Sequence, residues 1–401
     1  MIDFNAYVGS PTRSGAWLQP RMGFCDVEQM HRGLIATAKA NADTVCTITL
    51  DAFTRTNDFA AAGAAIARNH HLNGYPIVNH PAETTRAMIA QIAQDHGTPV
   101  QIRHGSPKPS KIFKRMVEVG ANTTEGGPVS YCLPYSRVPL SEAFTDWAEA
   151  CKTLSRGVAH SHVESFAGCM MGQMCDPAIL VALNILEGLF LIEHGIETVS
   201  FSYSQGTSAV QDQAAVRALQ MLAQQFFDPG KYHIVAYVFM GYFPRTMAGF
   251  SRITADALQV VRATDIARVI VKTPVESSRI PTIAENIASL EYAQSSMDRC
   301  DGDLFPHDDI DEYERILSMA TGLVKNVLSL DKDISVAILE AFKTGLLCVP
   351  YCLHPDNRLG SSTVLDDQNY ARMADATKGE SSSTFLANLR RNIQRYDRTS
   401  A

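Results

Sequence analysis

The stretch Ala121-Asn-Thr-Thr-Glu-Gly-Gly-Pro-Val-Ser-Tyr-Cys-Leu-Pro-Tyr135 joins a strand-like run to a loop with unusual chemistry. Its first four residues read as the end of a strand, and Glu125 follows them at once. Two glycines let the backbone turn sharply or approach a ligand closely, and Pro134 fixes the path between two phenols, Tyr131 and Tyr135. Alone, such a loop is as often a solvated turn as a site. Charged residues also follow other expected strands, and this repetition favours a site.

Eight β-branched or apolar runs alternate with stretches of helical periodicity on either side of this loop. The predicted strands are Thr44–Leu50, Pro76–Asn79, Val100–Arg103, Ala121–Thr124, Val158–Val163, Thr198–Tyr203, His233–Phe239 and Arg268–Thr273. The predicted helices include Ala60–Arg68, Lys111–Val119, Leu140–Leu154, Pro177–His194, Gln211–Phe227 and Ile253–Ala263. This alternation predicts an α/β fold, a (β/α)8 TIM barrel of parallel strands. An open doubly wound sheet is the alternative, but no GxGxxG follows the first strand.

Composition narrows the class of protein. The chain has 401 residues, of which 46% are hydrophobic and 19% charged, so it can bury a large core. Its net charge of −7 gives nucleic acid no general reason to bind. We expect a cytoplasmic protein with no membrane span, because no secretory signal opens the chain and Ala178–Ile192 is too short to cross a bilayer. The nine scattered cysteines contain no CxxC pair and are expected to be reduced thiols.

The end of the chain differs from the part that holds the predicted strands. Three helical segments follow the eighth strand, at about Ile283–Arg299, Glu312–Leu328 and Ser335–Gly345. Beyond Pro350 the chain turns polar, and it ends in a basic amphipathic helix near Ser383–Tyr396. We therefore expect a barrel domain over residues 1–300 and a C-terminal helical extension, residues 301–401, packed on the barrel.

Arginines near the ends of predicted strands indicate the class of ligand. Arg21 precedes the first predicted strand, Arg55 follows it, and Arg103 ends the third. In a barrel the chemistry lies where strands end and βα loops begin, and guanidinium groups match carboxylates bidentately. Any one arginine is more often a surface ion pair, but three converging on one mouth predict a substrate with two carboxylates.

Two histidines, His160 and His162, are candidate metal ligands. His160 and His162 alternate on a predicted strand, so both rings would face the same side. No third ligand can be named, and histidines of a buried polar layer are the favoured interpretation. No metal site is predicted.

Seven segments in register resemble the large epsilon (E) subunit family of glutamate mutase, also called methylaspartate mutase. They are Leu18–Gly23, Asp51–Asn57, Leu72–His80, Gln101–Gly105, Glu125–Tyr135, Met240–Pro244 and Val271–Glu276. The resemblance implies an adenosylcobalamin-dependent (β/α)8 barrel that converts L-glutamate to (2S,3S)-3-methylaspartate by a radical carbon-skeleton rearrangement.

The resemblance also implies residue roles. Glu125 is expected to face the substrate amino group as the catalytic residue, exchanging a proton with it. The expected substrate-binding residues are Arg21, Arg55, Arg103, His104, Glu125, Tyr131 and Tyr135. The expected cofactor-binding residues are Gly23, Asn73, Pro134, Phe243, Lys272, Glu276 and Ile280.

The need for a partner subunit is inferred from a motif that the sequence lacks. The cobalamin-carrying motif DxHxxG is absent, so the resemblance implies a separate small cobalamin-binding subunit of the sigma (S) type. A homodimer of the large subunit is also expected. The alternatives are a paralogous mutase for another amino acid and a cobalamin-free lyase or isomerase of a dicarboxylate, with Glu125 as base and Lys272 as electrophile. A non-catalytic partner of a cobalamin protein is disfavoured, because a scaffold has no reason to crowd buried charges.

Overall fold

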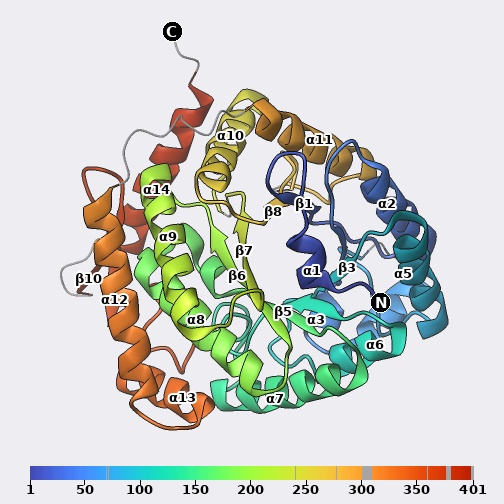
Figure 1. Cartoon of the computed structure of the whole chain (residues 1–401), viewed down its shortest axis with the longest axis horizontal. Helices are drawn as coiled ribbons and strands as arrows, with labels where there is room; N and C mark the ends of the chain where they lie inside the picture. The colour runs from blue at the N-terminus through green and yellow to red at the C-terminus, as the bar shows by residue number, and fades with distance from the viewer. Residues whose placement is uncertain are drawn as a thin grey trace.

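Eight parallel strands form the centre of the computed structural model (Figure 1), which describes residues 1–68, 70, 72–239, 241–276, 278–299, 309–358, 360–375 and 381–398. The strands are β1 (Trp17–Pro20), β2 (Cys46–Thr49), β3 (Val100–Arg103), β4 (Thr123–Glu125), β5 (His162–Ser165), β6 (Thr198–Ser204), β7 (Tyr232–Tyr237) and β8 (Arg268–Val271). Their order in the sheet is β1-β8-β7-β6-β5-β4-β3-β2. Leu18 closes the ring against the chain entering β2, because its N–H donates to Asp43 O at 2.8 Å and its carbonyl accepts from Val45 N at 3.0 Å. The predicted (β/α)8 barrel is confirmed.

Helices surround the strands and close one end of the barrel. They are α1 (Phe4–Val8), α2 (Val27–Lys39), α3 (Ala52–Arg55), α4 (Phe59–Ala67), α5 (Ala82–His96), α6 (Ser110–Val119), α7 (Leu140–Gly157), α8 (Pro177–Glu193), α9 (Ala209–Phe226), α10 (Met247–Ala263) and α11 (Ile283–Arg299). Helix α1 covers the N-terminal end of the strands, where Phe4 is fully buried. The opposite end, at the carboxyl ends of the strands, is therefore the open mouth.

Local sequence sets several of these boundaries. Helix α8 begins where the Asp176 side chain accepts the Ala178 N–H, directly before a proline at the first helical position. Helix α6 ends at Gly120, whose φ of 73° is easily reached only without a Cβ. Nearly every residue of α8 is buried. None of the helices in the described residues is long and apolar enough to cross a membrane.

Two strand predictions were wrong. The first strand is Trp17–Pro20, whose four residues include an inward polar Gln19 and so lack an apolar pattern. The run Pro76–Asn79 is a turn, in which the Pro76 carbonyl accepts from Asn79 N at 2.9 Å. The positional assignments change with them: Arg21 follows the first strand instead of preceding it, and Arg55 follows the second.

The fifth strand is displaced from its predicted position. It spans His162–Ser165, so Glu164 lies within it and is fully buried. His160 stands before the strand at φ 58° and pairs with Asp3 at 3.4 Å. The expectation that His160 and His162 share a face was therefore wrong.

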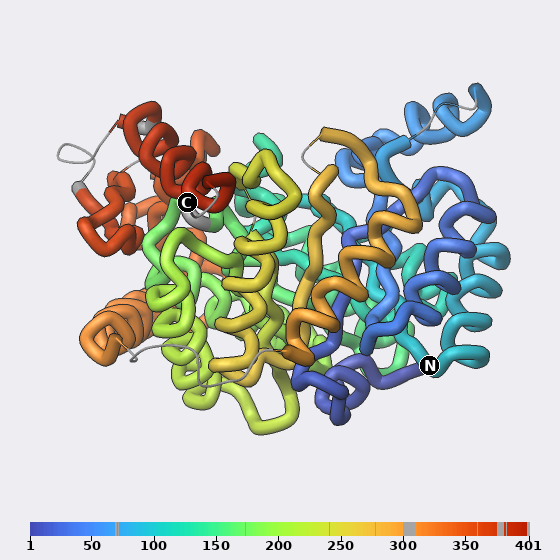
Figure 2. The backbone as a smooth tube through the Cα atoms, turned by 90° about the horizontal axis from the view of Figure 1, so that it is seen from above, coloured from blue at the N-terminus to red at the C-terminus, as the bar shows by residue number. Residues whose placement is uncertain are grey.

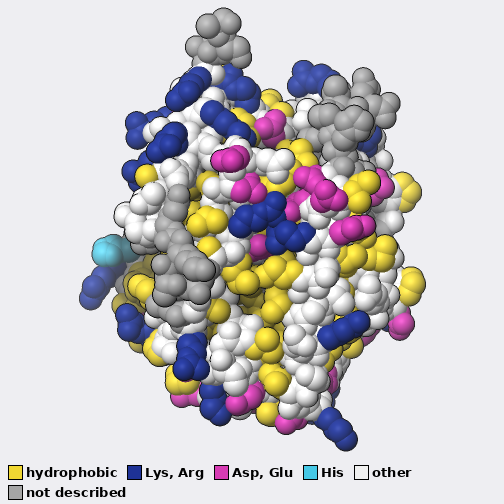
Figure 3. Space-filling model, turned by 90° about the vertical axis from the view of Figure 1, so that its left-hand side faces the viewer, with side chains coloured by type: hydrophobic (Ala, Val, Ile, Leu, Met, Phe, Trp, Pro, Cys, Tyr) yellow, Lys and Arg dark blue, Asp and Glu magenta, His cyan; other side chains and the backbone are white. Residues whose placement is uncertain are grey.

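The C-terminal segment packs against the barrel (Figure 2). It comprises α12 (Ile310–Leu328), α13 (Ile334–Thr344), the antiparallel pair β9 (Ser361–Leu365) and β10 (Ala371–Asp375), α14 (Ser382–Gln394) and the short turn Arg395–Asp397. Helix α12 lies on α8 and α9, and hydrophobic patches lie among charged side chains on this face (Figure 3). The helices agree with the expectation, whereas the strand pair was not predicted. The domain boundary expected between residues 300 and 301 lies outside the described residues and stays a prediction.

Candidate active site

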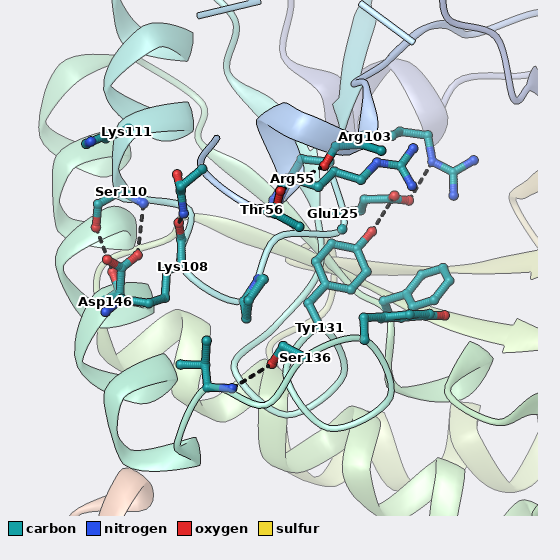
Figure 4. A pocket seen from close by; sticks show the side chains of 18 of the residues that line it. Arg55, Thr56, Arg103, Lys108, Ser110, Lys111, Glu125, Tyr131, Ser136 and Asp146 are labelled. Atoms are coloured by element: carbon teal, nitrogen blue, oxygen red, sulfur yellow. Dashed lines mark hydrogen bonds and ion pairs between the residues drawn. The ribbon is translucent and has the colours of Figure 1, made fainter. Parts of the chain in front are cut away.

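A cavity of about 900 Å³ opens at the carboxyl ends of β1 to β5 (Figure 4). All seven predicted substrate-binding residues line it: Arg21, Arg55, Arg103, His104, Glu125, Tyr131 and Tyr135. They come from the ends of four strands and the loops that follow, so distant parts of the sequence meet only because the barrel closes. Their shared location is established, and their roles stay predictions.

Arg103 and Glu125 pair with each other at the floor of this cavity. Arg103 Nε donates to Glu125 Oε2 at 2.6 Å, and both side chains are buried. Tyr131 donates to the other carboxylate oxygen. Burial opposes the charge on Glu125, but Arg103 and the hydrogen bonds from Tyr131, Arg103 and Tyr237 outweigh burial and hold its pKa below the ordinary value. Glu125 is therefore a carboxylate at neutral pH.

One nitrogen of the Arg103 guanidinium lacks a hydrogen-bond partner among the described residues. Arg103 Nη2 donates to Tyr237 OH at 3.0 Å, whereas Nη1 is buried and has no hydrogen-bond partner among the described residues. A buried guanidinium N–H without a partner costs free energy unless a ligand accepts it. Arg103 can thus bind an anion through Nη1 while it stays paired with Glu125.

The loop after β4 needs both of its glycines. Gly126 adopts φ 118°, and a Cβ there would lie 2.4 Å from the Tyr131 ring. A Cβ on Gly127 would lie 2.2 Å from the Glu187 carboxylate. That buried carboxylate, on α8, accepts from Val129 N at 3.0 Å and from Ser130 N at 2.7 Å. Hydrogen bonds to a buried carboxyl group on another element therefore hold the loop in place.

The remaining lining residues differ in exposure. His104 is buried against Trp147 and Tyr131, and burial lowers the pKa of its imidazole to about 3, so the ring is neutral. Tyr135 is 55% exposed and stands at the rim. Arg55 donates through Nε to the Leu50 carbonyl at 2.9 Å. Its position, like that of Arg21, leaves guanidinium surface facing the cavity.

A second cavity of about 420 Å³ adjoins the first and shares Arg21, Thr49 and Arg55 with it. Four of the seven predicted cofactor-binding residues line it: Gly23, Asn73, Glu276 and Ile280. Arg21 forms an ion pair with Glu276, which joins the predicted substrate and cofactor groups.

The other three predicted cofactor residues line neither cavity. Lys272 follows β8, and its ammonium lies 4.8 Å from the centre of the Phe243 ring. Burial lowers the pKa of Lys272 to about 8, partly offset by Glu276. Pro134 lies in the turn between Tyr131 and Tyr135.

Sequence reasoning missed two residues that contact or support the site. Tyr237 ends β7 and bonds both Arg103 and Glu125. Glu187 on α8 accepts from the backbone of the loop after β4, and a carboxyl group inside an otherwise apolar helical run was the available signal. Within the described part of the chain, no group of three or more His, Cys, Asp or Glu residues could hold a metal ion.

Comparison with known proteins agrees with this geometry. The family described as methylaspartate mutase E chain matches residues 5–395. The chain is 30% identical over 376 residues to the glutamate mutase epsilon subunit of Yersinia enterocolitica, covering 89% of this chain and 76% of that protein. It is 29% identical to the epsilon subunit of Escherichia coli O157:H7, with the same coverage, and 28% identical to that of Halobacterium salinarum, covering 88% and 76%. A solved glucosidase from Croceicoccus marinus aligns with a TM-score of 0.39 and 10% identity over 66% of this chain and 62% of that one, too distant to inform function. The match over almost the whole chain, together with a barrel whose mouth gathers the expected residues, shows that this protein belongs to the methylaspartate mutase E chain family.

Proposed function

We propose that this protein is the large catalytic subunit of an adenosylcobalamin-dependent glutamate mutase, which converts L-glutamate to (2S,3S)-3-methylaspartate. The observation that carries the proposal is the convergence of Arg21, Arg55 and Arg103 on one cavity whose floor holds the carboxylate Glu125. Glutamate carries two carboxylates and one ammonium, and three guanidinium groups beside one carboxylate complement that charge pattern.

The second cavity suits the adenosyl part of the coenzyme. Ile280 is 45% exposed and offers an apolar surface for a purine, while Glu276 and Asn73 offer groups that can bond ribose hydroxyls. When bound, the coenzyme would supply the carbon radical that starts the rearrangement. The chain lacks DxHxxG, so a separate small subunit of the sigma type would bind the cobalamin.

The residues of this chain have three tasks in such a reaction. Arg21, Arg55 and Arg103 Nη1 bind the substrate carboxylates and orient the carbon skeleton. The same charged groups retain small charged fragments that would otherwise diffuse away. Glu125 binds the substrate ammonium and accepts its proton when the neighbouring carbon becomes a radical centre, then returns it.

A cobalamin-free lyase or isomerase is the second candidate. The pKa of Lys272, about 8, favours it, because a neutral amine can attack a carbonyl. The lowered pKa of Glu125 disfavours it, since a carboxylate stabilised by Arg103 is a weak base for a C–H proton.

Reconstitution separates these candidates. The purified chain is mixed with the small cobalamin-binding subunit of a related glutamate mutase, adenosylcobalamin and L-glutamate, and 3-methylaspartate is followed by proton NMR. Product is expected only when all components are present. Turnover without cobalamin would indicate the lyase, and no product alongside an active related large subunit would contradict glutamate as the substrate.

A further inference from the structure

A continuous path of buried polar side chains connects the floor of the site to the centre of the barrel. Glu164, on β5, is the register partner of Glu125 on the adjacent strand β4 and is fully buried. Its Oε2 accepts from Arg268 Nη2 at 2.6 Å, in an ion pair with no exposed surface. Its Oε1 is bonded to the hydroxyl of Tyr237. The Tyr237 oxygen lies 3.0 Å from Glu125 Oε2, so one phenol bridges two carboxylates.

The lower end of this path is held firmly. Arg268 donates to Gln19 and Gln101, to Ser200 Oγ at 3.1 Å and to His233 Nε2 at 3.3 Å. Its guanidinium also lies 5.1 Å from the centre of the Phe4 ring. Every polar atom of the guanidinium thus has a partner, and Glu164 has little freedom to move.

At the upper end of this path, the Tyr237 hydroxyl has two possible hydrogen-bond acceptors. Tyr237 OH carries a single hydrogen, and its oxygen already accepts from Arg103 Nη2 at 3.0 Å. That hydrogen can be donated to Glu164 or to Glu125, but not to both at once. The carboxylate that does not receive it faces the lone pairs of the phenol oxygen, which is unfavourable while that carboxylate is charged.

We propose that Tyr237 is a positioning residue that moves its hydrogen bond between Glu164 and Glu125 and so adjusts the site to the charge on Glu125. When Glu125 is ionised, the phenol donates to it. When Glu125 carries a proton taken from the substrate ammonium, the phenol donates to Glu164, whose charge is held by Arg268. This inference rests on the proposed function only in assigning a proton to Glu125 during turnover.

Other charged and titratable groups also surround Glu125 and Tyr237, and they contribute to the electrostatic environment of both side chains. They are Arg103 and His104 at the end of β3, Tyr131 after β4, Glu164 on β5, Cys169 after β5, Arg55 on α3 and Lys272 after β8.

The test uses Tyr237→Phe in the reconstituted holoenzyme, because this variant removes only the hydroxyl. A matched control is Tyr203→Phe, since Tyr203 donates to the buried carboxylate of Asp212 at 2.8 Å and lines neither site cavity. In Tyr237→Phe we expect kcat to fall about ten- to a hundredfold with KM changed less than about threefold. The acid limb of kcat/KM should move to higher pH by roughly one unit, because Glu125 loses a donor. Tyr203→Phe should retain wild-type kcat and pH profile.

An active holoenzyme in which Tyr237→Phe matches wild type in kcat and pH profile would overturn the inference. A melting temperature lowered equally in both variants, with no change in either pH profile, would overturn it as well.

If wild type does not turn over glutamate, the proposed function fails, and a double-mutant cycle in the isolated chain then decides about Tyr237. Unfolding free energies are measured for wild type, Tyr237→Phe, Glu125→Gln and the double variant. Non-additive effects support the shared hydrogen bond, and additive effects contradict it.

Discussion

Arg103 and Glu125, the last residues of neighbouring strands β3 and β4, form an ion pair of 2.6 Å whose side chains are only 3% and 5% exposed. Each residue was predicted to bind a different charged group of the substrate, yet in the free protein each neutralises the other. A substrate carboxylate must therefore use Arg103 Nη1 together with Arg21 and Arg55. The pair keeps two charges buried and oriented before any substrate arrives.

Replacing Arg103 by lysine tests the guanidinium geometry. Lysine keeps the charge but cannot bond Glu125, Tyr237 and a substrate carboxylate at once. We expect kcat/KM of the reconstituted enzyme to fall about ten- to a hundredfold, corresponding to the loss of one charge-assisted hydrogen bond. Wild-type kinetics at an unchanged melting temperature would remove Arg103 from the site.

Glu125→Gln should change both stability and its dependence on pH. The variant leaves Arg103 without a buried counter-charge, so the free energy of unfolding should fall by about 3 kcal/mol near pH 7. A carboxyl whose pKa is lower in the folded chain stabilises the fold above its unfolded pKa of about 4.5, and this contribution is lost as the pH falls through the lower folded value. The gap between wild type and variant in urea unfolding should therefore narrow as the pH is taken below about 5. A gap that stays constant at acidic pH would contradict the lowered pKa.

Gly127→Ala tests the rigid loop after β4. The added methyl group would meet the Glu187 carboxylate at 2.2 Å, so we expect a loss of about 1–3 kcal/mol and weakened glutamate binding measured by calorimetry. Gly322→Ala is the control, because a Cβ on this residue of α12 meets nothing within 4 Å. The control should gain up to about 1 kcal/mol through helix propensity. Equal effects of the two substitutions would rule out the steric explanation.

Lys272→Met examines the buried ammonium after β8. A base whose pKa is lowered from 10.5 to about 8 on folding destabilises the fold while it is protonated, and this cost disappears as the pH rises between these values. Relative to the variant, wild type should gain up to about 3 kcal/mol between about pH 7 and about pH 10. Lys343→Met, at a position whose side chain is 76% exposed, should show no such pH dependence. Parallel pH curves for Lys272→Met and wild type would argue against a perturbed lysine.

Arg315→Met tests how the C-terminal segment is anchored. Arg315 on α12 contacts Asp176 at 3.0 Å and Glu312 at 2.9 Å, and both carboxylate side chains are almost completely buried. Removing the guanidinium leaves these charges with less compensation, so unfolding should become easier by about 3–5 kcal/mol. Arg13→Met breaks an exposed pair with Asp43 and should cost less than about 1 kcal/mol. Similar losses in urea unfolding for both variants would show that the buried contacts do not anchor the segment.

The sequence by itself determined much about this protein. Apolar periodicity located several helices closely, as in Ile283–Arg299, because burial on one face imposes a regular spacing on each of them. Alternation of strand and helix led to a closed parallel barrel, in which residues that end strands must meet at one mouth. The alternation therefore sufficed to place Arg103 and Glu125 at one mouth, whereas the strand that Arg21 follows was not predicted.

Tertiary structure alone decided how those charges are shared. Four-residue β1 carries an inward polar side chain, Gln19, so no apolar pattern marks it, whereas the apolar run Pro76–Asn79 forms a turn in which Ile77 is buried. The pairing of Arg103 with Glu125, and the bridge from Glu125 through Tyr237 to Glu164, join residues on four different strands. Such contacts depend on the register and closure of the barrel, which set distances of a few ångströms that sequence spacing does not contain.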